Sequence, residues 1–136
     1  MWKQKVREEN GSVFIFTLFL IPVIIALGGL LIDVGMIAVD KTRLAGAVDS
    51  ASWAALDSYD RELWEEEGIP VLIESEAFFL AQTYLHANMP QATLTKFVVN
   101  GNRVEVEGAS VTKLFFMKMF GFHEVTVYAS SKTKIG

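Results

Sequence analysis

The chain has 136 residues and a net charge of −4 at pH 7, from 12 Lys and Arg residues against 16 Asp and Glu residues. This acidic balance, without a long basic run, argues against nucleic acid as a partner. The sequence contains no cysteine, which excludes disulfides, thiolate metal sites and a cysteine nucleophile.

The first predicted element is an uncharged apolar run over residues 12–32, SVFIFTLFLIPVIIALGGLLI. At about 1.5 Å per residue, a helix of this length spans roughly 30 Å, the thickness of the hydrocarbon core of a bilayer. The run therefore predicts one transmembrane helix, with the lipid bilayer as a partner. A cleaved secretory signal peptide is the alternative, but the run is longer than a usual signal core and no A-x-A-like site follows it.

Basic residues indicate which way this helix points. Three precede the run in the leader over residues 1–11, and two follow it before residue 50. The positive-inside rule then predicts a single-pass protein with a cytoplasmic leader and an exported C-terminal domain. A cut between Gly11 and Ser12 would remove the leader and keep the apolar helix, so these two residues form a possible processing site.

The helical pattern continues outward to about residue 59. Residues 33–59 lack proline and are rich in Ala and Leu, which favour helices. Apolar side chains recur there at helical spacing. These are Val34, Ile37, Leu44, Val48 and Leu56.

Small residues form a second stripe along the same helix. Small side chains at heptad-like spacing let another backbone come close, and a proline within the span can bend the helix. We interpret the stripe as a helix-packing interface, with an Ala-rich helix that lacks a partner as the alternative. The interface comprises Pro22, Gly28, Gly35, Ala38, Ala45 and Ser52.

Two carboxylates lie near the outer end of the apolar run. Asp33 follows it directly, and Asp40 lies two turns further on roughly the same face. We expect both to be interfacial acids in contact with water. If assembly moved Asp33 deeper into the membrane, its charge would need a partner.

The remaining residues, 60–136, are expected to form one small exported α+β domain. Its acidic start, residues 60–68, predicts a helix end or a surface loop, whose glutamates could bind a cation but more plausibly form a solvated face. A second, amphipathic helix is predicted over residues 72–87. Its apolar stripe comprises Ile73, Ala77, Leu80, Tyr84 and Ala87.

Three strands are predicted after that helix. Residues 93–99 and 103–107 alternate around a tight turn at Asn100-Gly101, which predicts a β-hairpin ended by Gly108. The hairpin and a later strand would make a small three-stranded antiparallel sheet.

The residues after the hairpin complete that sheet. Residues 111–120 predict a short helix or an irregular segment pressed on the core. Residues 124–135 alternate again and predict the last strand.

The sequence holds no positive signal for catalysis. His86 and His123 stand far apart, and no metalloprotease, phosphate-loop or nucleophile-elbow motif is present. We therefore expect no enzyme activity, no cofactor and no metal site.

Residues 9–56 combine features in an order that resembles a known family. A charged residue and a glycine precede an apolar run with a central proline, then a G-x-x-x-D-x-G step, a basic pair and an Ala-rich helix. This stretch resembles the N-terminal module of the TadE/TadG-like family of the tight-adherence (Flp) pilus system, and the segment FFMKMFG with its following strand resembles the end of the same proteins. The corresponding residues are Glu9 and Gly11, Pro22, Gly29 to Asp33 and Gly35, Lys41 with Arg43, Val48 to Leu56, and Phe115 to Gly121.

The resemblance implies a pilin-like fold and a structural or assembly role in a bacterial surface filament or secretion apparatus. Implied partners are copies of this chain, other pilin-like subunits and pilus assembly proteins. The implied location is the bacterial cytoplasmic membrane, or the cell exterior if the chain enters a filament. Pilins of this type usually carry Glu five residues after the processing site, where this chain has Phe16. A membrane-anchored extracytoplasmic binding or sensor module is the alternative function.

Overall fold

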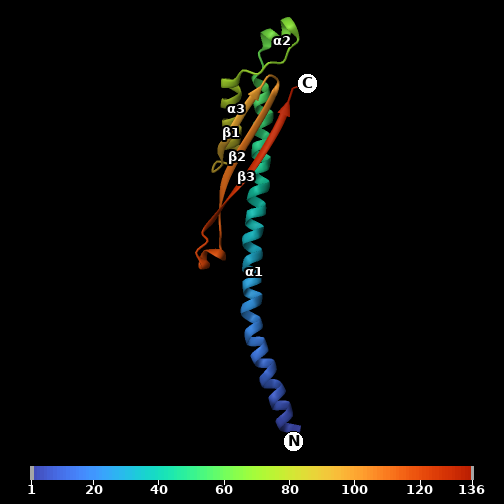
Figure 1. Cartoon of the computed structure of the whole chain (residues 1–136), viewed down its shortest axis with the longest axis vertical. Coiled ribbons are helices and arrows are strands. Elements are labelled where there is room, and N and C mark those ends of the chain that lie inside the picture. Colours follow the sequence, from blue (N-terminus) through green and yellow to red (C-terminus); the bar gives the residue numbers. More distant parts are fainter. Residues whose placement is uncertain (1, 136) are drawn as a thin grey trace. The chain divides into compact units, whose positions relative to one another are not determined.

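The computed structural model describes residues 2–135, with side chains described from Asn10 onward. The order of the elements confirms the predicted α+β class, in which a long apolar helix precedes further helices and an antiparallel sheet. The elements are α1 (Trp2–Ala55), the 3₁₀ helix η1 (Leu56–Ser58), α2 (Arg61–Glu67), α3 (Glu74–Asn88), β1 (Thr93–Asn100), β2 (Arg103–Lys113), the 3₁₀ helix η2 (Met117–Phe120) and β3 (Glu124–Lys134) (Figure 1).

The chain forms two compact units. The first contains the residues up to Gly35 together with the segment Leu114–His123. The second contains Met36–Lys113 and the residues from Glu124 onward. Helix α1 contributes its apolar part to the first unit and its Ala-rich part to the second.

In the first unit, the apolar part of α1 exposes almost all of its side chains. The helix continues through Pro22. The Thr17 hydroxyl donates a hydrogen bond to the Val13 carbonyl at 2.8 Å. Its most apolar stretch has a mean hydropathy of 2.8 and no buried residue, so the helix is long and apolar enough to cross a membrane.

In the second unit, a three-stranded antiparallel sheet in the order β1-β2-β3 packs against helices. The strands pair from Thr93 with Ala109 to Asn100 with Arg103, and from Arg103 with Lys134 to Lys113 with Glu124. The core joins one face of α1, one face of α3 and the inner face of the sheet. Its centre is Leu44, Val48, Ala51, Ala55, Ala77, Ala81, Leu85, Val104, Val106 and Val127.

Strand β2 runs through Gly108 to Lys113, whereas the sequence predicted that Gly108 would end it. The glycine is needed at this position because α1 comes close to the strand. A Cβ at Gly108 would lie 2.9 Å from Val48 Cγ2 and 3.5 Å from Leu44 Cδ1. The glycine leaves room for α1 against the middle of the strand. A glycine that reads as a strand end in the sequence is therefore a helix-packing position.

Helix α3 buries a stripe that shares only Ala77 with the predicted one. Ala77, Ala81 and Leu85 are buried, whereas Ile73 and Tyr84 are exposed. Both stripes have helical spacing, and the small alanines belong to the same core as the Ala-rich face of α1. Close packing of small residues decided which face turned inward.

The acidic stretch over residues 60–68, which the sequence predicts as a helix end or a surface loop, contains the short helix α2. Asp60 caps it by accepting hydrogen bonds from the Glu62 and Leu63 backbone N–H groups at 3.1 and 3.3 Å. Gly68 ends it with a φ of 67°, a left-handed conformation that favours glycine. Its glutamate side chains are exposed.

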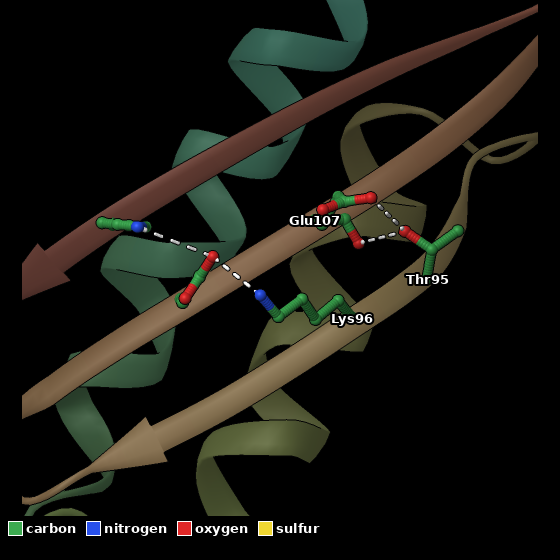
Figure 2. A network of polar contacts seen from close by, with 5 residues as sticks. Thr95, Lys96 and Glu107 are labelled. Carbon is green, nitrogen blue, oxygen red and sulfur yellow. Dashed lines mark hydrogen bonds and ion pairs between the residues drawn. The ribbon is translucent and has the colours of Figure 1, made fainter.

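The outer face of the sheet is polar, as the alternation of β2 predicts. Lys96 Nζ lies 3.1 Å from Glu105 Oε1, and Lys132 Nζ lies 3.8 Å from the same oxygen. The Thr95 hydroxyl donates to the Glu107 carbonyl at 3.1 Å. Figure 2 looks onto this face, with the helices behind the sheet. The second unit thus turns its charges outward and its small apolar side chains inward.

Candidate functional site on helix α1

Asp33 is the centre of the candidate site. Among the side chains that the structure describes, it is the only charged one that is buried, with 1 % of its surface exposed. Its carboxylate accepts four hydrogen bonds from three consecutive backbone N–H groups. Phe115 N donates to Oδ1 at 2.7 Å, Phe116 N to Oδ1 and Oδ2 at 3.0 and 3.1 Å, and Met117 N to Oδ2 at 2.7 Å.

These donors come from a tight turn in the segment Leu114–His123, which we call the apolar loop. Phe116 has helical φ and ψ and leads directly into η2, so the first N–H groups of that helix have no partner within it. A carboxylate placed there acts as a cap with charge-assisted hydrogen bonds. We call Asp33 and the N–H groups of Phe115, Phe116 and Met117 the aspartate clamp.

The apolar loop closes on itself at both ends. Leu114 N donates to the His123 carbonyl at 2.9 Å, and Phe122 N donates to the Met117 carbonyl at 3.1 Å. Gly121 turns the chain with a φ of 92°. The loop is thus a defined piece of structure that the clamp attaches to α1.

The structure differs from the expectation that Asp33 contacts water. Its partner is the backbone of its own chain, 82 to 84 residues further along. A carboxylate can be buried because its oxygens receive several donors at once. Its place at a membrane interface stays a prediction.

Gly29 lies one turn before Asp33 and receives the ring of Phe116. A Cβ at Gly29 would overlap that ring, lying 2.5 Å from its Cγ. Phe116 also packs against Phe120, with ring centroids 5.5 Å apart. Gly29 and Asp33 belong to one sequence motif, and in the structure both contact the same loop.

The other predicted carboxylate, Asp40, lies in the second unit and is partly exposed. Its Oδ2 accepts a hydrogen bond from the Thr112 hydroxyl at 2.8 Å, and Thr112 itself is buried. Further along α1, Asp49 accepts from the Ser131 hydroxyl at 2.9 Å. These hydrogen bonds attach the Ala-rich part of α1 to the sheet.

The predicted packing stripe is mostly open. A Cβ at Gly28 or Gly35 would meet nothing within 4 Å. Pro22, Ala38 and Ala45 are exposed as well. Most of the stripe is therefore free for a neighbouring helix, and its role as an interface stays a prediction.

Ser52 is the member of the stripe that faces inward. It is buried, and its hydroxyl lies 2.6 Å from that of Thr133. Ser52 therefore helps to hold α1 on its own sheet.

The possible processing site lies in a regular part of α1. Gly11 and Ser12 are both helical and exposed. Cleavage between them stays a prediction.

Large exposed apolar side chains distinguish the apolar loop. The sequence predicted that residues 111–120 are pressed on the core, and this is wrong for most of them, since only Thr112 and Leu114 are buried. The backbone clamp holds the loop while most of its large apolar side chains stay exposed. The exposed fractions are 69 % for Phe115, 78 % for Met119, 64 % for Phe120 and 60 % for Phe122.

One comparison with known proteins finds a family match along α1. Residues 11–58 match the family model for putative Flp pilus-assembly TadE/G-like proteins. This confirms the resemblance over that stretch and supports a pilus-associated role. No curated protein and no solved structure matches the chain.

Proposed function

We propose that this protein is a membrane-anchored, pilin-like structural or assembly subunit of a bacterial Tad/Flp-type filament or secretion apparatus. Its α1 helix anchors it in the cytoplasmic membrane, with the leader inside and the sheet exported. The same helix then packs against copies of this chain or other pilus subunits. The role is structural, in keeping with a matched family that is named for pilus assembly.

The observation that carries this proposal is the open stripe of small residues on the matched helix. In the first unit, Gly28 and Gly35 are open while Gly29 and Asp33 are covered by the apolar loop. In the second unit, Ala45 is exposed while Leu44 is buried. In both units these open small residues lie on a part of the helix that the described part of the chain leaves free, whereas Ser52 faces the sheet.

Open glycines favour helix association in lipid for a physical reason. Lipid tails are as apolar as leucine side chains, so helices gain little from hydrophobicity alone and need close backbone contact. In a filament, the helix would exchange lipid contacts for contacts with neighbouring helices. Bulk at Gly28 or Gly35 would keep the two backbones apart.

The surface hollows of the second unit give the binding-module alternative no comparable support. One hollow on the sheet is lined by charged side chains such as Arg103, Glu105 and Lys132, beside Val98 and Val104. Another lies between α3 and β1, around Phe78 and Phe97, and it is open to solvent. A small-molecule site would combine a concave apolar wall with a few converging polar groups.

Gly28→Leu and Gly35→Leu in the native host test the packing claim. The space beside both residues is open, so the variants are expected to fold and insert into membranes while failing to assemble. Met36→Leu is the matched control, because it changes an exposed residue on the same helix without adding bulk to the stripe. Material sheared from the cell surface and the membrane fraction are compared. Normal filaments from both glycine variants would contradict the packing claim.

The mass of the native protein tests the filament assignment separately. A chain beginning at Ser12 and enriched in sheared surface material is the expected result for a processed filament subunit. Full-length protein confined to the membrane would identify an anchored assembly factor instead.

A further inference from the structure

The apolar loop places large apolar side chains where a water-facing loop normally carries polar ones. Phe115, Met119, Phe120 and Phe122 are each more than half exposed. They are consecutive or near neighbours in sequence, so the exposure is one patch and not scattered single residues. Such a patch on a folded protein marks a surface that something apolar covers.

The position of the loop on α1 indicates what covers it. The Phe116 ring lies on Gly29, and Gly29 precedes Ile32, the last residue of the apolar run, by three positions. At 1.5 Å per residue, this contact lies about 4.5 Å inside the end of the run. Amphipathic elements that lie on membranes bury their apolar face by roughly 5 to 10 Å. The loop is thus attached to the helix at the depth of an interfacial membrane element.

Most backbone N–H groups of the loop have hydrogen-bond acceptors within the chain, as lipid surroundings require. A lipid-exposed irregular segment is unfavourable chiefly because its N–H groups lack acceptors. Here Asp33 accepts three of these groups, and carbonyls within the loop accept several others. The groups with such acceptors are those of Leu114, Phe115, Phe116, Met117, Met119, Gly121 and Phe122.

The clamp also gives the Asp33 carboxylate hydrogen-bond partners close to the hydrocarbon. A carboxylate near the end of a membrane span is unfavourable without partners, and so are three free N–H groups. Each supplies what the other lacks. Lys118 is exposed within the same loop, and a lysine at this depth can extend its ammonium to lipid phosphates.

We propose that the apolar loop is a second membrane contact, with Phe115, Met119, Phe120 and Phe122 inserted among lipid acyl chains beside α1. Asp33 is the latch that holds the loop there. The proposal rests on the membrane anchoring proposed above and adds a lipid-binding surface outside the spanning helix.

Because the chain has no cysteine, single-cysteine variants of the full-length protein can each carry one nitroxide spin label. Met119→Cys and Phe122→Cys report on the loop, Leu31→Cys on the anchor and Val98→Cys on an exposed strand position. The protein is reconstituted in vesicles of phosphatidylethanolamine and phosphatidylglycerol. Collisions of each label with oxygen, which enters lipid, are compared with collisions with a water-soluble nickel chelate.

The expected result is that both loop labels resemble the Leu31 label, with frequent oxygen and rare nickel collisions, while the Val98 label shows the reverse. Loop labels that resemble Val98 while Leu31 remains in lipid would overturn the loop insertion and leave the anchor intact. A Leu31 label in water would overturn the membrane anchoring and the loop proposal together. Loop labels shielded from both reagents and coupled to labels on a second copy, even at high lipid dilution, would replace lipid by a chain–chain contact.

Discussion

The two units of this protein distribute their side chains in opposite ways. In the first unit, large apolar residues such as Phe19 and Leu31 are exposed, and the charged Asp33 is buried. In the second unit, small residues such as Ala51 are buried, and Lys96 and Glu105 lie on the outer face of the sheet. Both arrangements obey the same preference of apolar groups for apolar surroundings, if lipid surrounds the first unit and water the second.

The comparison also shows two uses of a buried polar contact. In the first unit, one carboxylate accepts hydrogen bonds from three backbone N–H groups and holds a loop with mostly exposed side chains. In the second, single hydroxyl contacts such as Thr112 with Asp40 supplement a core that is already packed. The first unit should therefore depend on its polar contact far more than the second does.

The largest expected effect comes from Asp33→Ala. It removes all four hydrogen bonds of the clamp and leaves three N–H groups without an acceptor, so the apolar loop should detach from α1. Hydrogen exchange of the Phe115–Met117 amides should speed up strongly, while amides of β2 keep their protection. Asp33→Asn, which retains one acceptor oxygen, should give an intermediate effect. Unchanged exchange at Phe115–Met117 in the alanine variant would show that the clamp does not hold the loop.

Two adjacent glycines provide the next test. Gly29→Ala places a methyl group in the Phe116 ring and should destabilise the loop attachment by about 1 to 3 kcal/mol, the usual range for overpacking. Gly28→Ala is the matched control, since it has free space and should be neutral or stabilising by up to about 1 kcal/mol through helix propensity. Limited proteolysis within Leu114–His123 measures both. Equal cleavage rates in the two variants would contradict the contact.

Gly108→Ala makes the corresponding test in the second unit. Its new methyl group would press on Val48 and should lower the free energy of unfolding by about 1 to 2 kcal/mol, measured in urea. Because the clash is with one stiff side chain, adding Val48→Ala should relieve part of it, which a double-mutant cycle detects. Strict additivity of the two changes would argue against direct contact.

The smallest effect concerns the outer face of the sheet. The hydrogen bond from Lys96 lowers the pKa of Glu105 from its ordinary 4.5; partial burial opposes this, and the charge of Lys132 adds to it. A carboxyl group with a lowered pKa stabilises the fold above its ordinary pKa and loses that contribution as the pH falls through its folded value. The melting temperature of the parent chain should slightly exceed that of Glu105→Gln at neutral pH. The two melting temperatures should converge as the pH falls below 4.5, the ordinary pKa of the Glu105 carboxyl, and through its lowered value in the folded chain. A difference that stays constant until the carboxyl is fully protonated would exclude this ion pair as its cause.

Much of this fold could be predicted from local sequence. The uncharged run over residues 12–32 predicts a helix of membrane length because no charge interrupts it. The hairpin at Asn100-Gly101 follows from alternation on either side of a turn that favours glycine, which has a φ of 63° here. Each of these signals lies in one continuous stretch of the sequence, so neither depends on a residue far away in the chain.

The tertiary structure decided what depends on residues far apart in the chain. Ala81 and Tyr84 lie on two different apolar stripes of α3, both with helical spacing. Packing against the Ala-rich face of α1 buried Ala81 and left Tyr84 exposed. The sequence predicts a strand end at Gly108, whereas in the structure the strand continues and Val48 packs against the glycine.

Asp33 reads as an interfacial acid until Phe115, 82 residues away, donates to it. The sequence determined which residues are apolar, small or charged and with what local periodicity they recur. Only the folded chain decided which of them meet, because burial and hydrogen bonding depend on a partner that no local pattern specifies.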